Sequence, residues 1–211
     1  MIRRFLTGNI TKAQLSRVII PASFVMMLFW LISRVLFGAS GQWYLWEQNA
    51  ISNQGNIRTN PIGCWFFVVG TVLASFNIVI LLKFVFNRLG KKLRWLSWIF
   101  LLSGLTGAFG LFLVGVTPEG SGRVLTGIHM IGSQLAFTGL GSCAALSWLI
   151  GIIRVATKQP WPSAIQVFAL LGLVFQIGSM IFFTKSGTWI QWTSFNAILI
   201  WLVGLFLIVP D

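Results

Sequence analysis

The sequence has little charge, and almost none of it is negative. Three of its 211 residues are acidic, one is histidine and two are cysteine, and charged residues make up 9% of the chain. Soluble domains carry about 25% charged residues, so an ordinary soluble protein is excluded. The few acidic and histidine side chains have no metal-ligand spacing, and a single histidine excludes bis-histidine haem ligation. We therefore expect no metal site and no cofactor.

Long apolar runs fill the chain instead. Hydrophobic residues make up 56% of the sequence, and its mean hydropathy is +0.87. A helix of about 20 apolar residues crosses the roughly 30 Å of hydrocarbon in a bilayer. Six runs are long enough, at about 18–37, 62–82, 95–116, 127–150, 163–183 and 189–209. The sequence therefore predicts an all-α, multi-pass membrane protein: a six-transmembrane-helix bundle in which residues 1–211 form one integral membrane domain.

The placement of the basic residues predicts the orientation of this bundle. Eleven of the fifteen Lys and Arg lie before the first run, after the second or after the fourth: Arg3, Arg4, Lys12, Arg17, Lys83, Arg88, Lys91, Lys92, Arg94, Arg154 and Lys158. Basic residues concentrate in cytoplasmic loops. We expect both termini in the cytoplasm, and the loops after the first, third and fifth runs outside or in a lumen. The excess of basic residues gives the sequence a high isoelectric point. Because these residues are shared among loops between apolar runs, the high isoelectric point does not indicate nucleic-acid binding.

Small residues in two runs predict how the helices pack. Glycines recur three positions apart at 104, 107 and 110 in the third run, and the fourth run contains Gly132, Gly139 and Gly141. Such spacing lets membrane helices approach closely. We expect close packing here; a flexible gating helix is the alternative. Cys64 and Cys143 lie at different depths and cannot come within the roughly 7 Å between Cα atoms that a disulfide needs, so both are expected to be packing residues.

The connection between the first two runs, loop 1 (residues 38–61), is long and polar. Connections of more than about 12–15 residues usually carry a function or fold onto the protein. A short re-entrant or interfacial helix is expected to begin at residues 49–52 and to end at Gly55. The alternative is a polar lid whose side chains satisfy backbone groups at the mouth of the bundle. The candidate binding residues of this loop are Glu47, Ser52, Asn53, Gln54, Asn56 and Arg58.

Loop 3 (residues 117–123) joins the third and fourth runs and contains Glu119, a Gly-Ser-Gly turn and Arg123. Free backbone N–H groups and the dipole at a helix start can hold an anion, so this loop is a candidate seat for a phosphate or lipid head group, with Arg123 and Arg58 supplying charge. The same sequence also suits any tight turn between two helices.

His129 lies one to two turns inside the fourth run, on the same side of the membrane as Glu47 and Glu119. An ionisable residue within a membrane span indicates function by default. One interpretation is a neutral histidine that anchors loop 1 through a hydrogen bond to an amide or carboxylate of that loop. Another is acid–base chemistry with Glu119 or Glu47, in which Ser52 is a candidate nucleophile although no Gly-x-Ser-x-Gly context surrounds it.

Two short motifs carry a resemblance to a family. The first is Ile51-Ser52-Asn53-Gln54-Gly55-Asn56, followed by Asn60-Pro61 and an apolar helix with Gly70; the second is Gly115-Val116-Thr117-Pro118-Glu119, a polar turn and Gly127-Ile128-His129. Together they resemble the DRAM/FRAG-like membrane proteins and their prokaryotic relatives. The resemblance implies six helices and a polar cluster on the outer or lumenal side. It also implies a link to the lipid handling, GPI-anchor remodelling and autophagy with which the eukaryotic relatives are associated.

Three functions remain open at this point. The first is a non-enzymatic membrane protein that binds a lipid head group or another membrane protein through its outer polar site, or serves as a subunit of a membrane assembly. The few ionisable residues within the spans favour it over a proton relay. The second is an intramembrane lipid-modifying enzyme that uses His129 with Glu119 or Glu47. The third is a transporter or scramblase, which needs more polar groups at midplane than this chain has.

Overall fold

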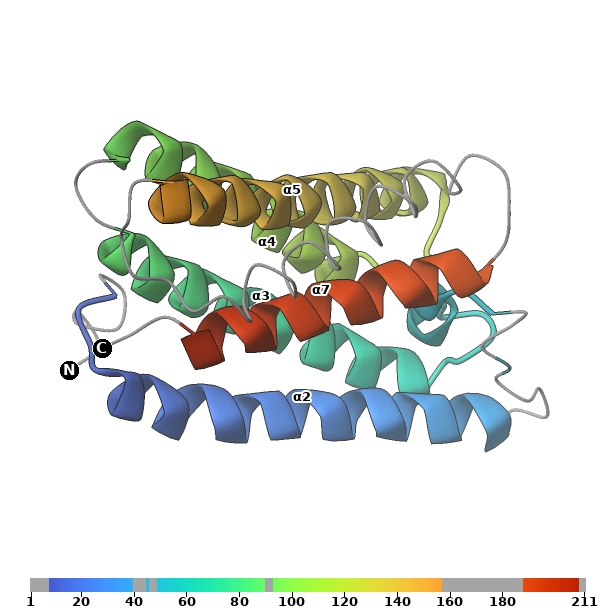
Figure 1. Ribbon diagram of the computed structural model, residues 1–211. Coiled ribbons are helices and arrows are strands. Elements are labelled where there is room, and N and C mark those ends of the chain that lie inside the picture. The colour runs from blue at the N-terminus through green and yellow to red at the C-terminus, as the bar shows by residue number, and fades with distance from the viewer. Residues whose placement is uncertain (1–7, 40–44, 46–48, 90–92, 157–187, 209–211) are drawn as a thin grey trace.

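Long helices account for nearly all of the chain that the computed structural model describes, namely residues 8–39, 45, 49–89, 93–156 and 188–208 (Figure 1). In this part of the chain there is no β-strand, in agreement with the all-α prediction. The elements are α2 (Lys12–Ala39), the short 3-10 helix η1 (Ile51–Gly55), α3 (Gly63–Arg88), α4 (Arg94–Val116), α5 (Arg123–Ala156) and α7 (Thr188–Ile208).

Four of these helices are long and apolar enough to cross a membrane: Lys12–Gly38, Gly63–Arg88, Arg94–Val116 and Arg123–Ile153. The chain is therefore an integral, multi-pass membrane protein. The observed helices extend beyond several of the expected runs, because an apolar run marks only the part that crosses hydrocarbon. The run expected at 163–183 lies outside the described residues. The run expected at 189–209 corresponds to α7, whose described apolar part, Phe195–Leu207, is shorter than the other four.

Contacts at the two ends of the bundle fix the direction of the helices. At one end, which we call the basic end, Lys12 Nζ donates a hydrogen bond to the carbonyl of Leu207 (2.8 Å), and Arg88 Nη2 donates to that of Ile10 (2.7 Å). At the opposite end, the loop end, Trp192 Nε1 donates to the carbonyl of Asn49 (3.0 Å). Thus α2 begins and α7 ends at the basic end, while loops 1 and 3 lie at the loop end.

The helices are not equally enclosed. In Figure 1, α2 lies along one side of the bundle and α4 and α5 along the other, with α3 and α7 between them. Of the four membrane-crossing helices, α2 has the smallest buried share, and large apolar side chains such as Phe24 and Val35 are exposed on it. In a membrane protein such side chains face lipid, so their exposure does not indicate a missing partner.

Glycine contacts join α4 to α5. A Cβ placed on Gly110 would clash with the backbone of Ala136 and Gly132, and one on Gly107 would clash with the backbone of Gly139 and Leu140. The two backbones therefore touch over more than one turn, which only glycine permits. The close packing expected from the glycine spacing is confirmed at these positions.

Replacing Gly110 with alanine should destabilise the protein by about 1–3 kcal/mol, because the added methyl group forces the two backbones apart. Gly127→Ala is the matched control, since a Cβ there meets nothing within 4 Å. Thermal unfolding in detergent measures both. A Gly110→Ala variant as stable as Gly127→Ala would contradict the direct contact between α4 and α5.

Candidate functional site

The second half of loop 1 folds back over the helix ends. After η1, the backbone of loop 1 pairs with loop 3: Glu119 N donates to the carbonyl of Gly55 (3.1 Å), and Ile57 N donates to that of Glu119 (2.9 Å). These bonds form an isolated parallel bridge between Asn56 and Glu119. The expected short helix that ends at Gly55 is observed, and the residues directly after it lie beside Glu119.

One buried side chain holds this arrangement together. Asn60 is 1% exposed, and its Nδ2 lies 2.8 Å from the carbonyl of Gln54, 3.1 Å from that of Ser33 and 3.2 Å from Ser33 Oγ. Gly63 leaves the room that the Asn60 amide occupies, since a Cβ there would clash with it. Asn60 therefore joins η1 to α2 from the start of α3.

Neither Asn60 nor Ser33 was among the binding residues that the sequence indicated. Asn60 entered only as part of the first motif, directly before Pro61, and Ser33 only as a serine four residues before the end of an apolar run. Both residues donate to backbone carbonyls, and the motif does not indicate that role.

Arg58 and Asn56 shape the contact between the loops. Asn56 Oδ1 accepts from the backbone N–H groups of Arg58 (2.9 Å) and Thr59 (3.4 Å), as in an Asx turn. Arg58 Nε then donates to the carbonyl of Gly120 (3.1 Å), where the backbone has a φ of +81°. Arg58 thus supports loop 3 directly, whereas Arg123 is exposed at the start of α5.

The hydrogen bond of His129 differs from the anchoring interpretation. Its Nδ1 lies 2.7 Å from the carbonyl of Thr117, so the partner belongs to loop 3 and not to loop 1. A carbonyl only accepts, which means that Nδ1 carries the hydrogen. His129 is 4% exposed. It therefore braces loop 3 against the first turns of α5, and loop 1 is held through the backbone of Glu119 instead.

Three buried acceptors at the loop end have no hydrogen-bond partner within the described part of the chain: Gln54 Oε1, Glu119 Oε2 and His129 Nε2. With the hydrogen on Nδ1, the Nε2 atom of a neutral histidine can only accept. Buried polar groups almost always have partners. The loop end is therefore rich in acceptors and suits a molecule that supplies hydroxyl or amine donors.

A cavity of ≈ 180 Å³ opens between α2 and α7 beneath η1, and we call it the outer cavity. Its lining is mostly apolar, with Arg34, Gln54 and Asn196 as the polar exceptions. The lining residues are Met27, Trp30, Leu31, Arg34, Ile51, Gln54, Phe67, Trp192, Phe195, Asn196 and Leu199.

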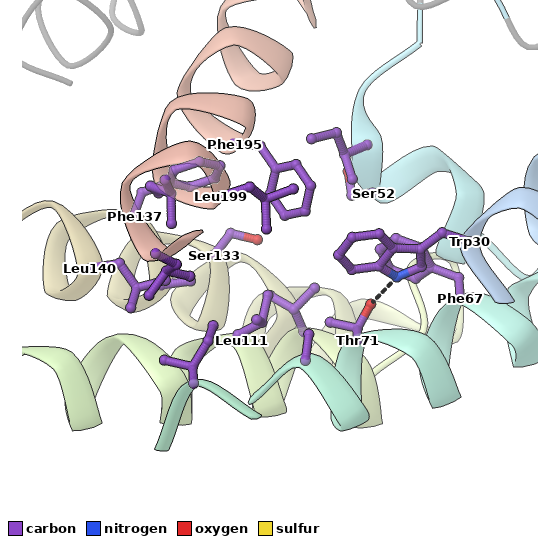
Figure 2. A pocket seen from close by; sticks show the side chains of 17 residues that line it. Trp30, Ser52, Phe67, Thr71, Leu111, Ser133, Phe137, Leu140, Phe195 and Leu199 are labelled. Atoms are coloured by element: carbon purple, nitrogen blue, oxygen red, sulfur yellow. Dashed lines mark hydrogen bonds between the residues drawn. The ribbon is translucent and has the colours of Figure 1, made fainter. Parts of the chain in front are cut away.

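A second cavity of ≈ 60 Å³, the inner cavity, lies deeper between α3, α4, α5 and α7 (Figure 2). Ser52 reaches it from η1, and Thr71 and Ser133 line it from α3 and α5; most of the rest of its wall is apolar. The two cavities have five lining residues in common: Trp30, Ile51, Phe67, Phe195 and Leu199.

The candidate binding residues thus separate into groups. Ser52 and Gln54 line the cavities, whereas Asn56, Arg58, Glu119 and His129 hold loops 1 and 3 together. Asn53 makes a local hydrogen bond to the side chain of Asn49 (3.2 Å), and Glu47 lies outside the described residues. The sequence did not indicate Arg34, Trp192 and Asn196, because their neighbours come from distant parts of the chain.

Comparisons of this chain with protein-family models, with curated proteins and with solved structures found no match.

Replacing Asn60 with leucine should cost about 1–3 kcal/mol, because the buried carbonyl of Gln54 keeps only the bond from Ser33 Oγ (3.3 Å) and the Asn60 link to Ser33 is lost. It should also speed trypsin cleavage after Arg58, because loop 1 loses its attachment. Asn53→Leu is the control, since its bond is local and half exposed, and it should change the cleavage rate little. Equal cleavage rates in the two variants would contradict the role of Asn60.

Replacing His129 with leucine should cost about 1–3 kcal/mol, because the buried carbonyl of Thr117 loses its donor. His129→Gln should retain most of the stability, since an amide can donate in place of Nδ1. Thermal unfolding of both variants in detergent measures the difference. If the leucine variant matched the parent, the bracing role of His129 would be wrong.

Proposed function

We propose that this protein binds a membrane lipid in the outer cavity, with the lipid head group at the loop end, and that it does so without catalysis. The observation that carries the proposal is the outer cavity itself, an apolar chamber with a cation and two amides in its wall. Ligand sites of this kind are mostly apolar, and a few polar groups fix the orientation of the ligand.

The polar residues of the outer cavity match the parts of a phospholipid head group. Arg34 supplies a guanidinium group, which binds phosphate oxygens in a bidentate manner. Gln54 presents a buried acceptor with no donor from the described residues, which suits a hydroxyl or amine of the head group. Since one water needs about 10–15 Å³, the outer cavity holds roughly a dozen water-sized groups or more. That is enough for a phosphate and the atoms around it.

The location of the outer cavity in the membrane follows from the positive-inside rule. Of the Lys and Arg side chains that the structure describes, five lie towards the basic end (Lys12, Arg17, Lys83, Arg88 and Arg94) and three towards the loop end (Arg34, Arg58 and Arg123). On our proposal the basic end therefore faces the cytoplasm, the termini lie there, and the loop end faces outside or a lumen. The lipid then enters from the outer leaflet, through the opening between α2 and α7.

The direction of α7 supports six spans. Trp201 Nε1 of α7 donates to Ser147 Oγ of α5 (3.0 Å), while Phe195 and Phe137 line the same inner cavity nearer the loop end. The two helices are therefore parallel, and the chain between them has to return from the basic end to the loop end. The apolar run at 163–183 is long enough to make that crossing.

The resemblance to the DRAM/FRAG-like proteins remains part of the proposal. It rests on the two motifs of loops 1 and 3, which pair with each other through Gly55, Ile57 and Glu119. The association of that family with lipid handling agrees with a lipid site at the loop end.

A lipid-modifying enzyme is the second candidate, favoured by one observation. Glu119 Oε2 and His129 Nε2 are both buried without a partner from the described residues, as an acid–base pair would be before its substrate binds. However, neither residue lines the outer or the inner cavity. A lipid in the outer cavity would therefore not touch them, and we prefer binding without catalysis.

The orientation can be tested by labelling with a bulky, membrane-impermeant maleimide. Cysteine at Ser121 in loop 3 should react from outside in intact cells, whereas cysteine at Asn87 near the basic end should react only after the membrane is opened. The parent protein is the control, because its two cysteines, Cys64 and Cys143, are buried. Labelling of both positions from the same side would contradict the topology.

Lipid binding can be tested with a soluble short-chain phosphatidylglycerol. Arg34→Gln should weaken its binding to the protein in detergent by roughly 10- to 100-fold, since a hydrogen bond to a charged group contributes about 1.5–3 kcal/mol. Arg123→Gln removes the same charge from the exposed start of α5 and should have little effect. If Arg123→Gln weakened binding and Arg34→Gln did not, the head group would bind at loop 3 and the proposed site would be wrong.

A further inference from the structure

We propose that the inner cavity receives the end of one acyl chain of the bound lipid, so that this chain leaves the bilayer and enters the helix bundle. The inference rests on the proposed function, because the same lipid would have its head group in the outer cavity. It defines the ligand class further, as a glycerophospholipid with at least one flexible, unbranched chain.

The inner cavity has the lining that a hydrocarbon chain requires. Apart from the hydroxyl groups of Ser52, Thr71 and Ser133, its wall is built from aliphatic and aromatic side chains, such as Phe137 and Leu140 of α5 (Figure 2). The Thr71 hydroxyl already accepts a hydrogen bond from Trp30 Nε1 (3.2 Å). Apolar cavities of this kind stay dry and take up apolar molecules.

The two cavities adjoin through a wall of few side chains. Trp30 lines both, and its ring packs edge-on against Phe195, with the ring centroids 5.1 Å apart. Ile51 and Phe67 belong to both linings as well. A chain that passes Trp30 and Phe195 therefore goes directly from the outer cavity into the inner one.

The size of the inner cavity limits how much of a chain enters. At about 10–15 Å³ for each water-sized group, its ≈ 60 Å³ holds roughly four to six methylene groups. Chains in the bilayer are already in hydrocarbon, so the transfer gains no hydrophobic free energy. The favourable contribution is instead the dispersion attraction between the chain and the wall of the inner cavity. This attraction depends on how well the chain fills the inner cavity.

Ser133→Leu fills the inner cavity from α5 and provides the main test. Gln134→Leu introduces the same side chain one position further on, where α5 is exposed, and is the matched control. Ala74→Leu fills the inner cavity from α3, so a folding defect peculiar to one variant does not decide the result.

The measurement is photo-crosslinking with two phosphatidylglycerol probes in nanodiscs, one with a diazirine at the end of an acyl chain and one with a diazirine on the head group. Mass spectrometry then locates the labelled residues. In the parent and in Gln134→Leu, the chain probe should label Phe137 and Leu140, and the head-group probe should label α7 near Trp192 and Asn196. In Ser133→Leu and Ala74→Leu, the chain labelling should fall at least fivefold while the head-group labelling stays.

Two results would overturn the inference, and they differ in what they say of the proposed function. If the head-group probe labels α7 but the chain probe labels only lipid-exposed residues such as Phe24 and Phe109, the chain stays in the bilayer and only the further inference is wrong. If the head-group probe fails to label α7 in the parent, the outer cavity does not bind lipid and both proposals are wrong.

Discussion

The loop end depends on one constraint: backbone polar groups that lie away from water need partners inside the protein. In a buried position, the amide of Asn60 donates to the carbonyls of Ser33 and Gln54, and Ser33 Oγ also donates to the carbonyl of Gln54 (3.3 Å). These bonds join α2, η1 and the start of α3. From there loop 1 reaches loop 3 through the backbone of Glu119, and α7 through Trp192. The described second half of loop 1 thus covers the helix ends.

The helix bundle is packed more tightly in some parts than in others. On the side of α4 and α5, glycines bring the two backbones into contact and leave no space between them. Near the basic end, Phe84, Phe100 and Ile150 are completely buried. Towards the loop end, η1 spans α2, α3 and α7 without filling the space below it, because its side chains Ile51 and Ser52 reach only the top of the inner cavity. Both cavities lie in this less tightly filled part of the molecule.

Membrane physics explains which features the sequence could predict. A bilayer requires long apolar helices, and small residues at regular spacing let such helices pack closely. The helical class and the contact between α4 and α5 could therefore be predicted from composition and glycine spacing. The short helix ending at Gly55 also followed, since loop residues with turn chemistry act locally. The partner of His129 did not, because the carbonyl of Thr117 has no side-chain signature. Nor did the cavities, since Trp30, Gln54 and Asn196 meet only through the packing of distant helices.

We propose that the acceptor at Gln54, the cation at Arg34 and the apolar space behind Trp30 form one binding path for a lipid. Electron cryomicroscopy of the protein in lipid nanodiscs tests this central claim most directly. The account predicts a continuous, elongated density that begins beside Arg34 and Gln54 and passes Trp30 towards Ser133. Lipid density confined to the outer surfaces of the helices, with both cavities filled by side chains or empty, would contradict it.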